Sequence, residues 1–466
     1  MKTRDHTRLL ADLAKAYAEH APTSRSLHER AADVMVDGGS HTLRLMQPFP
    51  PRIVAARGAW LTDEDGHDIL DFWQGHLANI LGHNPELVTS ELARAFADRF
   101  GLQTGFTDRL QVEVAEILCR QTGAERVRFT TSGTLATMYS ILLSRAFTGR
   151  TLVMKVGGGW HGAQPWALKG VDYHADGGDG FQHVESAGVP VAVTDKVIVT
   201  DFNNPDRLRD HFRQHGDQLA CFIVEPFLGA GGFIPATLEY LQAARELADR
   251  HGVVLVFDEV ISGFRFRAGN VAALYGVQPD LATYGKIIGG GMPVAAVAGR
   301  ANIMDLVGRA GRRVVKFSGG TYCAHPASML AAKTLMAYLV AHEAEIYPRL
   351  AELGAQARRV TEAAFAEQDI YACCTGGPNE NLPGSSMFML HFPYREGACL
   401  DGPQDWHNPA VCDVVLREQV VPLAVLLENV FLIESHGGLS TAHGQADIDG
   451  LTEACRRAAR RIKPYL

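Results

Sequence analysis

The chain has 466 residues, of which 47% are hydrophobic and 21% are charged, a composition typical of a globular protein with more than one domain. Its net charge of −8 is not gathered into a long run of one sign, so we expect no nucleic-acid partner. No apolar stretch approaches the roughly 18 residues of a membrane span, and the charged N-terminus lacks the apolar core of a secretory signal; we therefore expect no membrane partner and a cytoplasmic location.

The N-terminal segment, residues 1–17, predicts an amphipathic helix, because Leu9, Leu10, Leu13 and Tyr17 recur at helical spacing. Four later runs are short, apolar and rich in Val or Ile, which is typical of strands buried on both faces of a sheet. They are residues 151–156, 196–200, 220–225 and 253–258. Helices are predicted at residues 135–147, 238–251 and 326–341. This alternation predicts an α/β fold with a mostly parallel central sheet and helices on both faces.

Other parts of the chain lack this alternation. Residues 170–190 are polar and glycine-rich, and residues 376–409 show no regular pattern, so both are predicted to be irregular. Residues 1–80 and 336–466 are predicted to form a smaller α+β domain built from both ends, beside a large domain of residues 81–335.

The eight cysteines form no C-x-x-C pair, and two of them are adjacent and poorly placed to bridge each other. We expect most of them to be small, buried side chains in a reducing cytosol rather than disulfides or zinc ligands. They are Cys119, Cys221, Cys323, Cys373, Cys374, Cys399, Cys412 and Cys455.

A cluster of hydroxyl residues precedes the predicted helix at residues 135–147. Free backbone N–H groups and the helix dipole attract an anion to such a position. Ser132 and Thr134 add hydroxyl donors there, and Gly133 lets the backbone approach closely. Taken alone, Ser and Thr at this place are ordinary helix caps.

Three further groups carry side chains suited to binding or catalysis, and two of them lie at the ends of predicted strands. Trp160 and His161 come after a glycine run, Asp258 ends a very apolar strand, and Lys286 has apolar neighbours and three glycines behind it. Ligands of open α/β sheets bind at the carboxyl ends of the strands, and an acid at the end of a buried run needs a cationic partner. A desolvated lysine loses part of its proton affinity and can form a Schiff base. Taken alone, Trp160 would be interpreted as a core aromatic residue, Asp258 as a capping or salt-bridged acid, and Lys286 as a surface lysine.

Read as one set, these groups have a common use. An anion site, an aromatic plate, an acid and a lysine are the four things that pyridoxal 5′-phosphate (PLP) requires from a protein. We therefore expect PLP as the cofactor, bound covalently to Lys286, and no metal.

Several segments resemble the class III aminotransferases, which are PLP enzymes of fold type I. The resemblance runs from about Asp37 to the last helix. It is carried by VFDEVISGF at residues 256–264, YGKIIGGGMP at 284–293, SGTLA at 132–136, RAFTGR at 145–150 and GGTYCAHP at 319–326. The nearest branch contains glutamate-1-semialdehyde aminomutases and β-amino acid aminotransferases, with markers GGSHTLR at residues 38–44 and ILGH at 80–83.

The resemblance implies which residues contact the cofactor. Lys286 forms the covalent link and acts as the base, and Asp258 pairs with the protonated ring nitrogen. The others stack on the ring (Trp160), hold the phosphate (Ser132, Gly133, Thr134) or reach the phosphate of the neighbouring subunit in a homodimer (Thr321).

On the substrate side, the resemblance implies that Glu225 lies near the substrate and that Arg44 binds its carboxylate. His41, His76 and the segment 170–190 are expected to help shape the pocket.

Three features depart from the family pattern. Leu135 stands where SGT usually continues with Glu, and Ala230 stands where aminomutases have Asn. Residues 433–443 are shorter than the aminomutase pattern and lack its glutamate. The last two departures weigh against an aminomutase.

We therefore predict a transaminase with an amino acid donor and a keto acid or other carbonyl acceptor. An intramolecular aminomutase and a PLP-dependent racemase or epimerase remain as alternatives. A non-catalytic binding protein of the same fold is disfavoured, because Lys286 and Asp258 are both present.

Overall fold

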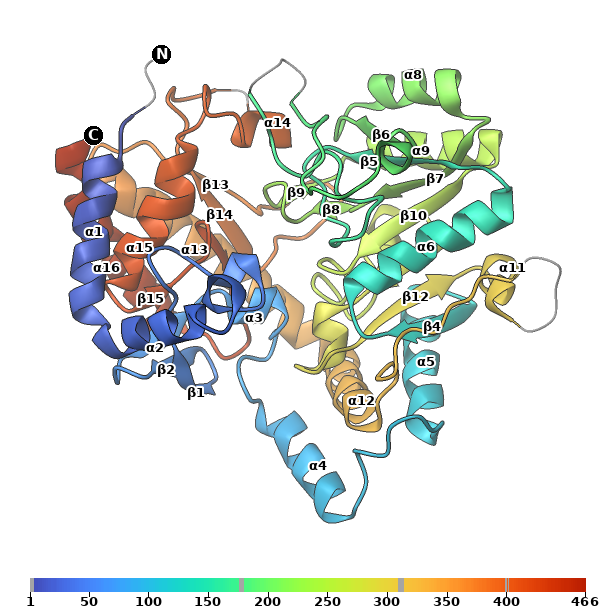
Figure 1. The fold of residues 1–466 in the computed structure, drawn as a ribbon, viewed down its shortest axis with the longest axis horizontal. Coiled ribbons are helices and arrows are strands. Elements are labelled where there is room, and N and C mark those ends of the chain that lie inside the picture. The colour runs from blue at the N-terminus through green and yellow to red at the C-terminus, as the bar shows by residue number, and fades with distance from the viewer. Residues whose placement is uncertain (1–3, 176–179, 309–313, 399, 401) are drawn as a thin grey trace.

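A seven-stranded sheet forms the centre of the larger lobe in the computed structural model, which describes residues 4–175, 180–308, 314–398, 400 and 402–466 (Figure 1). The strand order is β4-β12-β11-β10-β7-β5-β6, and β12 alone among these strands runs antiparallel to its neighbours. The predicted α/β fold with a mostly parallel sheet is therefore confirmed. The strands are β4 (Arg126–Thr130), β5 (Leu152–Val156), β6 (Val197–Thr200), β7 (Leu219–Val224), β10 (Val254–Glu259), β11 (Leu281–Tyr284) and β12 (Ala295–Gly299).

Side chains of the sheet alternate between two apolar layers, which explains why its strands read as continuous apolar runs. On β7, Cys221 and Ile223 pack in the layer with α6 (Gly133–Thr148), whereas Phe222 and Val224 pack in the layer with α9 (Leu238–His251). The two helices thus cover opposite faces of the sheet. The three predicted helices are confirmed, although α6 begins two residues earlier than its apolar pattern.

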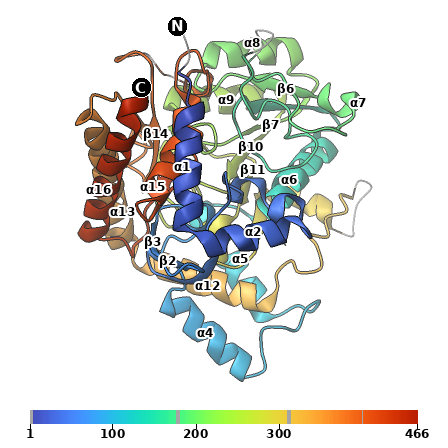
Figure 2. The ribbon, with the colours of Figure 1, turned by 60° about the vertical axis from the view of Figure 1, so that its left-hand side comes forward.

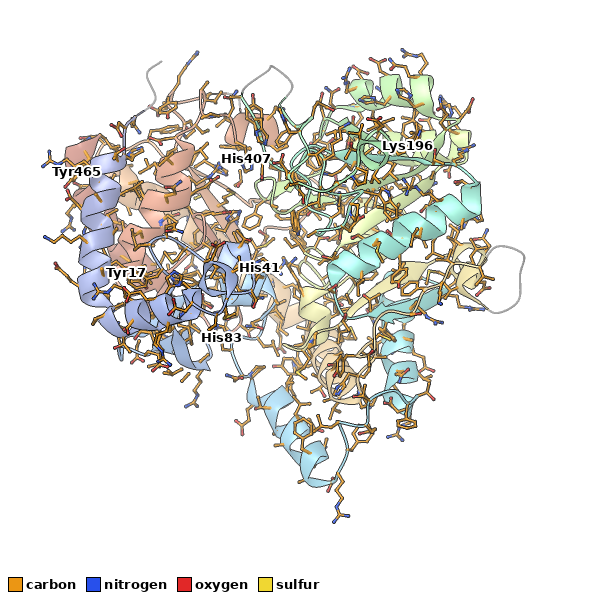
Figure 3. All side chains as sticks on the ribbon, in the orientation of Figure 1. Tyr17, His41, His83, Lys196, His407 and Tyr465 are labelled. Atoms are coloured by element: carbon orange, nitrogen blue, oxygen red, sulfur yellow. The ribbon has the colours of Figure 1, made fainter. Side chains whose placement is uncertain are left out.

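The smaller lobe combines segments from both ends of the chain. Helix α1 (Thr7–His20) buries Leu9, Leu13 and Tyr17 in a core shared with α13 (Glu343–Ala366), α15 (Val421–Leu426) and α16 (Gln445–Ile462). Figure 2 shows α1 running beside α15, and Figure 3 labels Tyr17 and Tyr465 on this side of the molecule. The N-terminal amphipathic helix is confirmed from Thr7 onward; residues 1–3 lie outside the described part. The predicted domain boundaries near residues 80 and 335 stay predictions, and α12 (Pro326–Ala341) continues across the second.

Two smaller sheets, β1-β2-β3-β15 and β13-β14-β16, belong to this lobe, and β8 pairs with β9 in the larger one. Their strands are β1 (Ile53–Arg57), β2 (Trp60–Asp63), β3 (Asp68–Asp71), β8 (Phe227–Leu228), β9 (Ile234–Pro235), β13 (Cys373–Thr375), β14 (Met387–His391), β15 (Val430–Phe431) and β16 (His436–Gly438). The remaining helices are α2 (Pro22–Ala32), α3 (Gln74–Leu77, with positive φ throughout), α4 (Glu86–Ala97), α5 (Arg109–Thr122), α7 (Val191–Thr194), α8 (Pro205–His215), α10 (Ala272–Tyr275), α11 (Ala301–Met304) and α14 (Pro403–Trp406).

Two predictions need correction. Residues 376–409 are not irregular throughout, because they contain β14 and α14. Strand β14 is short, buried and flanked by loop residues, so its four apolar residues carried no periodic signal. The cysteines are less buried than expected: of the seven described, Cys221, Cys412 and Cys455 are buried and the other four are half-buried. Cys399 lies outside the described residues.

The described part of residues 170–190 contains no helix or strand, as predicted. None of the described helices is both long enough and apolar enough to cross a membrane.

Candidate active site

Five strands of the central sheet, β4, β5, β7, β10 and β11, run in the same direction and end at the same edge. One predicted site residue lies near the end of each of these strands, and the carboxyl ends of parallel strands meet at one edge of a sheet. In chain order these residues are Ser132, Trp160, Glu225, Asp258 and Lys286.

Asp258 is buried and accepts three hydrogen bonds. The donors are Oγ1 of Thr283 at 2.9 Å, the backbone N–H of Val260 at 3.1 Å and Nδ1 of His161 at 2.8 Å. The sequence predicted a cationic partner for this acid, but burial lowers the pKa of His161 although Asp258 opposes the effect. The imidazole is therefore a neutral donor at Nδ1, and Lys286 is the cation that interacts electrostatically with Asp258.

Lys286 begins the short 3₁₀ helix η3 (Lys286–Gly289) with a left-handed backbone, φ +48°. Burial lowers the pKa of its amine to about 8, although Asp258 and Glu225 act in the opposite direction. More of this amine is uncharged near neutral pH than in an ordinary lysine, which favours reaction with an aldehyde.

The N-terminus of α6 fits a phosphate. Ser132 is its cap, since the Ser132 hydroxyl accepts a hydrogen bond from the backbone N–H of Leu135 at 3.3 Å. The backbone N–H groups of Gly133 and Thr134 belong to the first helical turn, where an anion is favoured. Gly162 lies against this turn: a Cβ atom at Gly162 would fall 2.4 Å from Oγ1 of Thr134. This close approach, the buried Asp258 and the low-pKa lysine suit PLP.

Glu225 connects two loops of the site. Its carboxyl oxygens accept hydrogen bonds from the backbone N–H of Trp160 at 3.0 Å and of Gly229 at 2.9 Å. Burial, followed by the charge of Asp258, raises the pKa of Glu225 to about 8. The Trp160 side chain is 41% exposed, so a large aromatic face is open to a planar ring.

Arg44 comes to the same region from the 3₁₀ turn Thr42–Arg44, which precedes β1. Nε of Arg44 donates a hydrogen bond to Nε2 of His76 at 2.9 Å, and the His76 ring lies 4.7 Å from the His41 ring. Both imidazoles interact electrostatically with Lys286. Figure 3 labels His41 near the middle of the view, between the smaller lobe and the central sheet.

Thr321 is the predicted site residue that stands apart. It is exposed in a turn after Gly320, and a Cβ atom at Gly320 would lie 3.7 Å from Oγ1 of Thr131. Its predicted contact with a neighbouring subunit stays a prediction.

Sequence reasoning missed three groups. His161 was noted beside Trp160, but its bond to Asp258 was not foreseen. Lys155 is fully buried in β5 and donates to the backbone carbonyls of Lys169 and Gly170 at 2.8 and 3.2 Å; a lone charge in an apolar strand was the available signal. Arg265 is buried and donates to the carbonyls of Ile261 and Leu77, and no sequence pattern marked it.

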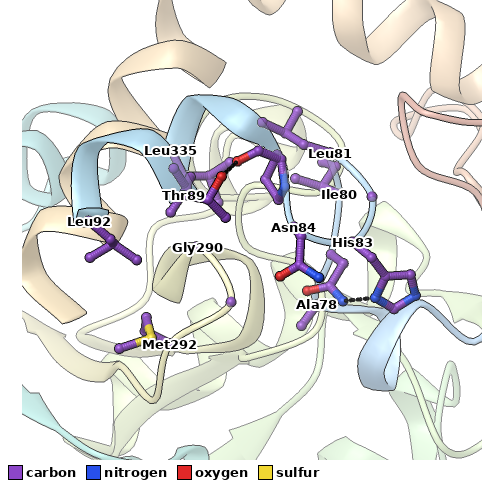
Figure 4. A pocket seen from close by; sticks show the side chains of 15 residues that line it. Ala78, Ile80, Leu81, His83, Asn84, Thr89, Leu92, Gly290, Met292 and Leu335 are labelled. Atoms are coloured by element: carbon purple, nitrogen blue, oxygen red, sulfur yellow. Dashed lines mark hydrogen bonds between the residues drawn. The ribbon is translucent and has the colours of Figure 1, made fainter. Parts of the chain in front are cut away.

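A separate pocket of about 200 Å³ lies beside the segment that follows α3 (Figure 4). None of the predicted site residues lines it. Its polar side has Asn79 bonded to His83 at 3.2 Å, and His83 bonded to Asp71 at 2.6 Å. The lining residues are Ala78, Asn79, Ile80, Leu81, Gly82, His83, Asn84, Pro85, Val88, Thr89, Leu92, Gly290, Gly291, Met292 and Leu335.

Comparison with known proteins gives consistent matches over most of the chain. The family model "Aminotransferase class-III" matches residues 44–364. A glutamate-1-semialdehyde 2,1-aminomutase of Halobacterium salinarum is 34% identical, over 94% of this chain and 99% of that protein. Among solved structures, an omega-transaminase from Sphaerobacter thermophilus has a TM-score of 0.84 at 33% identity, over 94% of this chain and 97% of that one. A β-phenylalanine aminotransferase from Variovorax paradoxus has a TM-score of 0.83 at 28% identity, over 97% of both chains.

Proposed function

The chain belongs to the class III aminotransferase family of PLP-dependent enzymes, and from this we propose that it moves an amino group from a carboxylate-bearing amino acid to a keto acid or another carbonyl acceptor. Members of this family that resemble the chain are PLP-dependent transaminases or aminomutases. Of these two reactions, we propose transamination.

The main support for a carboxylate-bearing donor is the position of Arg44 close to His76 and Lys286. Its side chain is exposed, it is bonded to His76, and His76 interacts electrostatically with the amine of Lys286. A guanidinium matches a carboxylate with two parallel charge-assisted hydrogen bonds. In the proposal, Arg44 holds the substrate carboxylate so that the amino-bearing carbon meets Lys286.

The remaining residues have the following roles in the proposal. Bound PLP supplies an electron sink for the electron pair left when the amino-bearing carbon loses its proton. Nζ of Lys286 takes that proton, since an amine with a lowered pKa is a better base near neutral pH. Asp258, oriented by His161, keeps a proton on the ring nitrogen. The phosphate is held by Ser132, Gly133 and Thr134, Trp160 stacks on the ring, and Glu225 lines the substrate side.

The test compares two donors that differ only in a carboxylate, β-phenylalanine and 1-phenylethylamine, with pyruvate as the acceptor. We expect the wild type to prefer the amino acid. Arg44→Ala should lower kcat/KM for the amino acid about 10- to 100-fold and leave the amine nearly unchanged. Arg44→Lys keeps the charge but loses the fork, so it should fall between the two. A wild type that prefers the amine, or an equal loss on both donors, would contradict the proposal.

An aminomutase is the second candidate, because the Halobacterium salinarum relative at 34% identity bears that name. Stoichiometry separates the two: a transaminase needs a second substrate, whereas a mutase converts glutamate-1-semialdehyde alone. Turnover of that compound without any acceptor would favour the mutase.

We also propose a homodimer in the cytoplasm. The dimer is supported by Tyr322, which follows Thr321 in the chain and is 61% exposed. The location rests on the cysteines, none of which is paired among those described, and cell fractionation tests it.

A further inference from the structure

The guanidinium of Arg44 is engaged on one side only. Its Nε donates to Nε2 of His76 at 2.9 Å. Within the described ranges, its two terminal nitrogens have no hydrogen-bond or ion-pair partner. A carboxylate can meet an arginine either end-on, at the two terminal nitrogens, or side-on, at Nε and one terminal nitrogen. The bond to His76 occupies Nε and leaves the end-on edge available.

His76 is held by an unusual piece of backbone. Gln74, Gly75, His76 and Leu77 all have positive φ, at 46°, 60°, 60° and 63°. These four residues form a single turn of left-handed helix, a conformation that is costly for any residue with a Cβ atom. A run of this kind persists only where its surroundings determine it.

Hydrogen bonds at both ends of the turn stabilise this backbone conformation. Asp71 accepts hydrogen bonds from the backbone N–H groups of Trp73 at 2.7 Å and Gln74 at 2.9 Å. At the other end, the carbonyl of Leu77 accepts a hydrogen bond from the buried Arg265. Arg265 has no acidic partner among the described residues, so its charge is directed at main-chain carbonyls of the site.

The ring of His76 is fixed as well. Its centroid lies 4.7 Å from the centroid of the Trp73 ring and 4.7 Å from that of the His41 ring. Burial, and then the charge of Arg44, lower the pKa of His76 to about 3. The imidazole is therefore neutral at physiological pH, and the nitrogen that faces Arg44 is a lone-pair acceptor.

We propose that His76 is a positioning residue for Arg44: the left-handed turn presents Nε2 of His76 to Nε of Arg44, so that the terminal nitrogens of the arginine meet the substrate carboxylate end-on. The inference rests on the proposed role of Arg44 and refines the role of His76, which acts on the substrate through the arginine rather than by contact. Three strained residues, Gln74, His76 and Leu77, then orient one flexible, exposed side chain.

The test uses two variants with the same backbone cost at φ +60°, His76→Leu and His76→Gln. Leu removes the acceptor, whereas the side-chain oxygen of Gln can still accept from Nε. We expect His76→Leu to raise KM for β-phenylalanine about 3- to 10-fold with a smaller change in kcat, and to affect 1-phenylethylamine clearly less than β-phenylalanine. His76→Gln should restore most of the loss. Binding of 3-phenylpropionate, a carboxylate without an amino group, should weaken in parallel when measured by calorimetry.

The outcomes separate this inference from the proposed function. If Arg44→Ala removes the preference for the carboxylate while His76→Leu keeps both the preference and the binding of 3-phenylpropionate, His76 does not position the arginine. If Gln fails to restore what Leu loses, or if both donors suffer equally, His76 is a packing residue or a direct substrate ligand, and the inference is wrong. If Arg44→Ala itself changes nothing, the proposed function fails first.

Discussion

The amine of Lys286 differs from an ordinary lysine in one measurable way, since burial lowers its pKa to about 8. Only the uncharged amine attacks the aldehyde of PLP. We predict that the apoenzyme recovers PLP faster as the pH rises, with a midpoint near 8. An ordinary lysine would keep gaining up to its usual pKa of about 10.4.

Stopped-flow absorbance of apoenzyme mixed with PLP measures this rate, and Lys286→Ala is the control without the covalent step. Borohydride reduction followed by mass spectrometry locates the pyridoxyl group. A label on another lysine, or a rate that is flat between pH 7 and 9, would refute the prediction.

The negative charge of the buried Asp258 is the property that its proposed role requires. It receives hydrogen bonds from Thr283 and His161, so an uncharged Asn of similar shape can keep part of this network. Asp258→Asn should retain PLP but lose about two orders of magnitude in kcat, because the fixed negative charge no longer favours a proton on the ring nitrogen. Near-wild-type turnover by a variant with full cofactor absorbance would show that Asp258 does not have the proposed role.

At the scale of elements, strands could be predicted from the sequence where β-branched apolar residues recur. Strands β5, β6, β7 and β10 were predicted because Val and Ile fill positions on both faces of the sheet. Strand β12 was missed, since its AAVAG stretch has small side chains and little β-branching.

The candidate site shows the same limit. Asp258 and Lys286 were found because strand ends and glycines mark them. The left-handed turn that carries His76 has only one glycine, Gly75, so its backbone conformation is determined by tertiary contacts such as the one from Arg265. No local pattern predicts such contacts.

The junction between α6 and the loop after β5 gives a prediction for these two elements together. Gly162 has φ +80°, and a Cβ atom there would lie 2.4 Å from Oγ1 of Thr134. Gly162→Ala should push the loop away from the helix N-terminus and weaken PLP binding about 10-fold or more, since phosphate donors must be placed closely.

Gly276→Ala is the matched control. Gly276 also has positive φ, +64°, but a Cβ atom there meets nothing within 4 Å. Both variants therefore pay the backbone cost of about 1–2 kcal/mol, and only Gly162→Ala adds the clash. Equal PLP affinity in the two variants, measured by equilibrium dialysis, would show that the clash is relieved without moving the phosphate donors.

At the scale of the whole molecule, the candidate site is assembled from distant parts of the chain. Arg44 and His76 precede the first strand of the central sheet in the chain, whereas Glu225, Asp258 and Lys286 lie at the ends of its strands. Phe72, just before the left-handed turn, packs in the core of the smaller lobe, whereas Leu77, at the end of the turn, packs in the layer of the larger lobe that contains α9. A shift between the lobes would therefore change the distance between Arg44 and Lys286.

The assembly also leaves apolar side chains uncovered around α4, which stands away from the rest of the molecule and packs on α12 (Figure 1). Leu102 and Phe106, between α4 and α5, are 75% and 73% exposed. Exposed apolar clusters of this kind mark interfaces. We predict that they are covered by a second copy of the chain, and that Thr321 then completes the phosphate site of its neighbour.

The double variant Leu102→Asp/Phe106→Asp should dissociate the dimer, because burying two such side chains contributes about 3–6 kcal/mol per subunit. Sedimentation at micromolar concentration should show monomers, and PLP should be lost more easily, since the contact from Thr321 disappears with the partner. Val191→Asp is the control: Val191 is also apolar and 71% exposed, but it lies on α7, far from α4 in Figure 2. This control should remain dimeric with full PLP content. A wild type that is monomeric and still holds PLP tightly would contradict both the interface and the shared phosphate site, and a double variant that stays dimeric would contradict the interface.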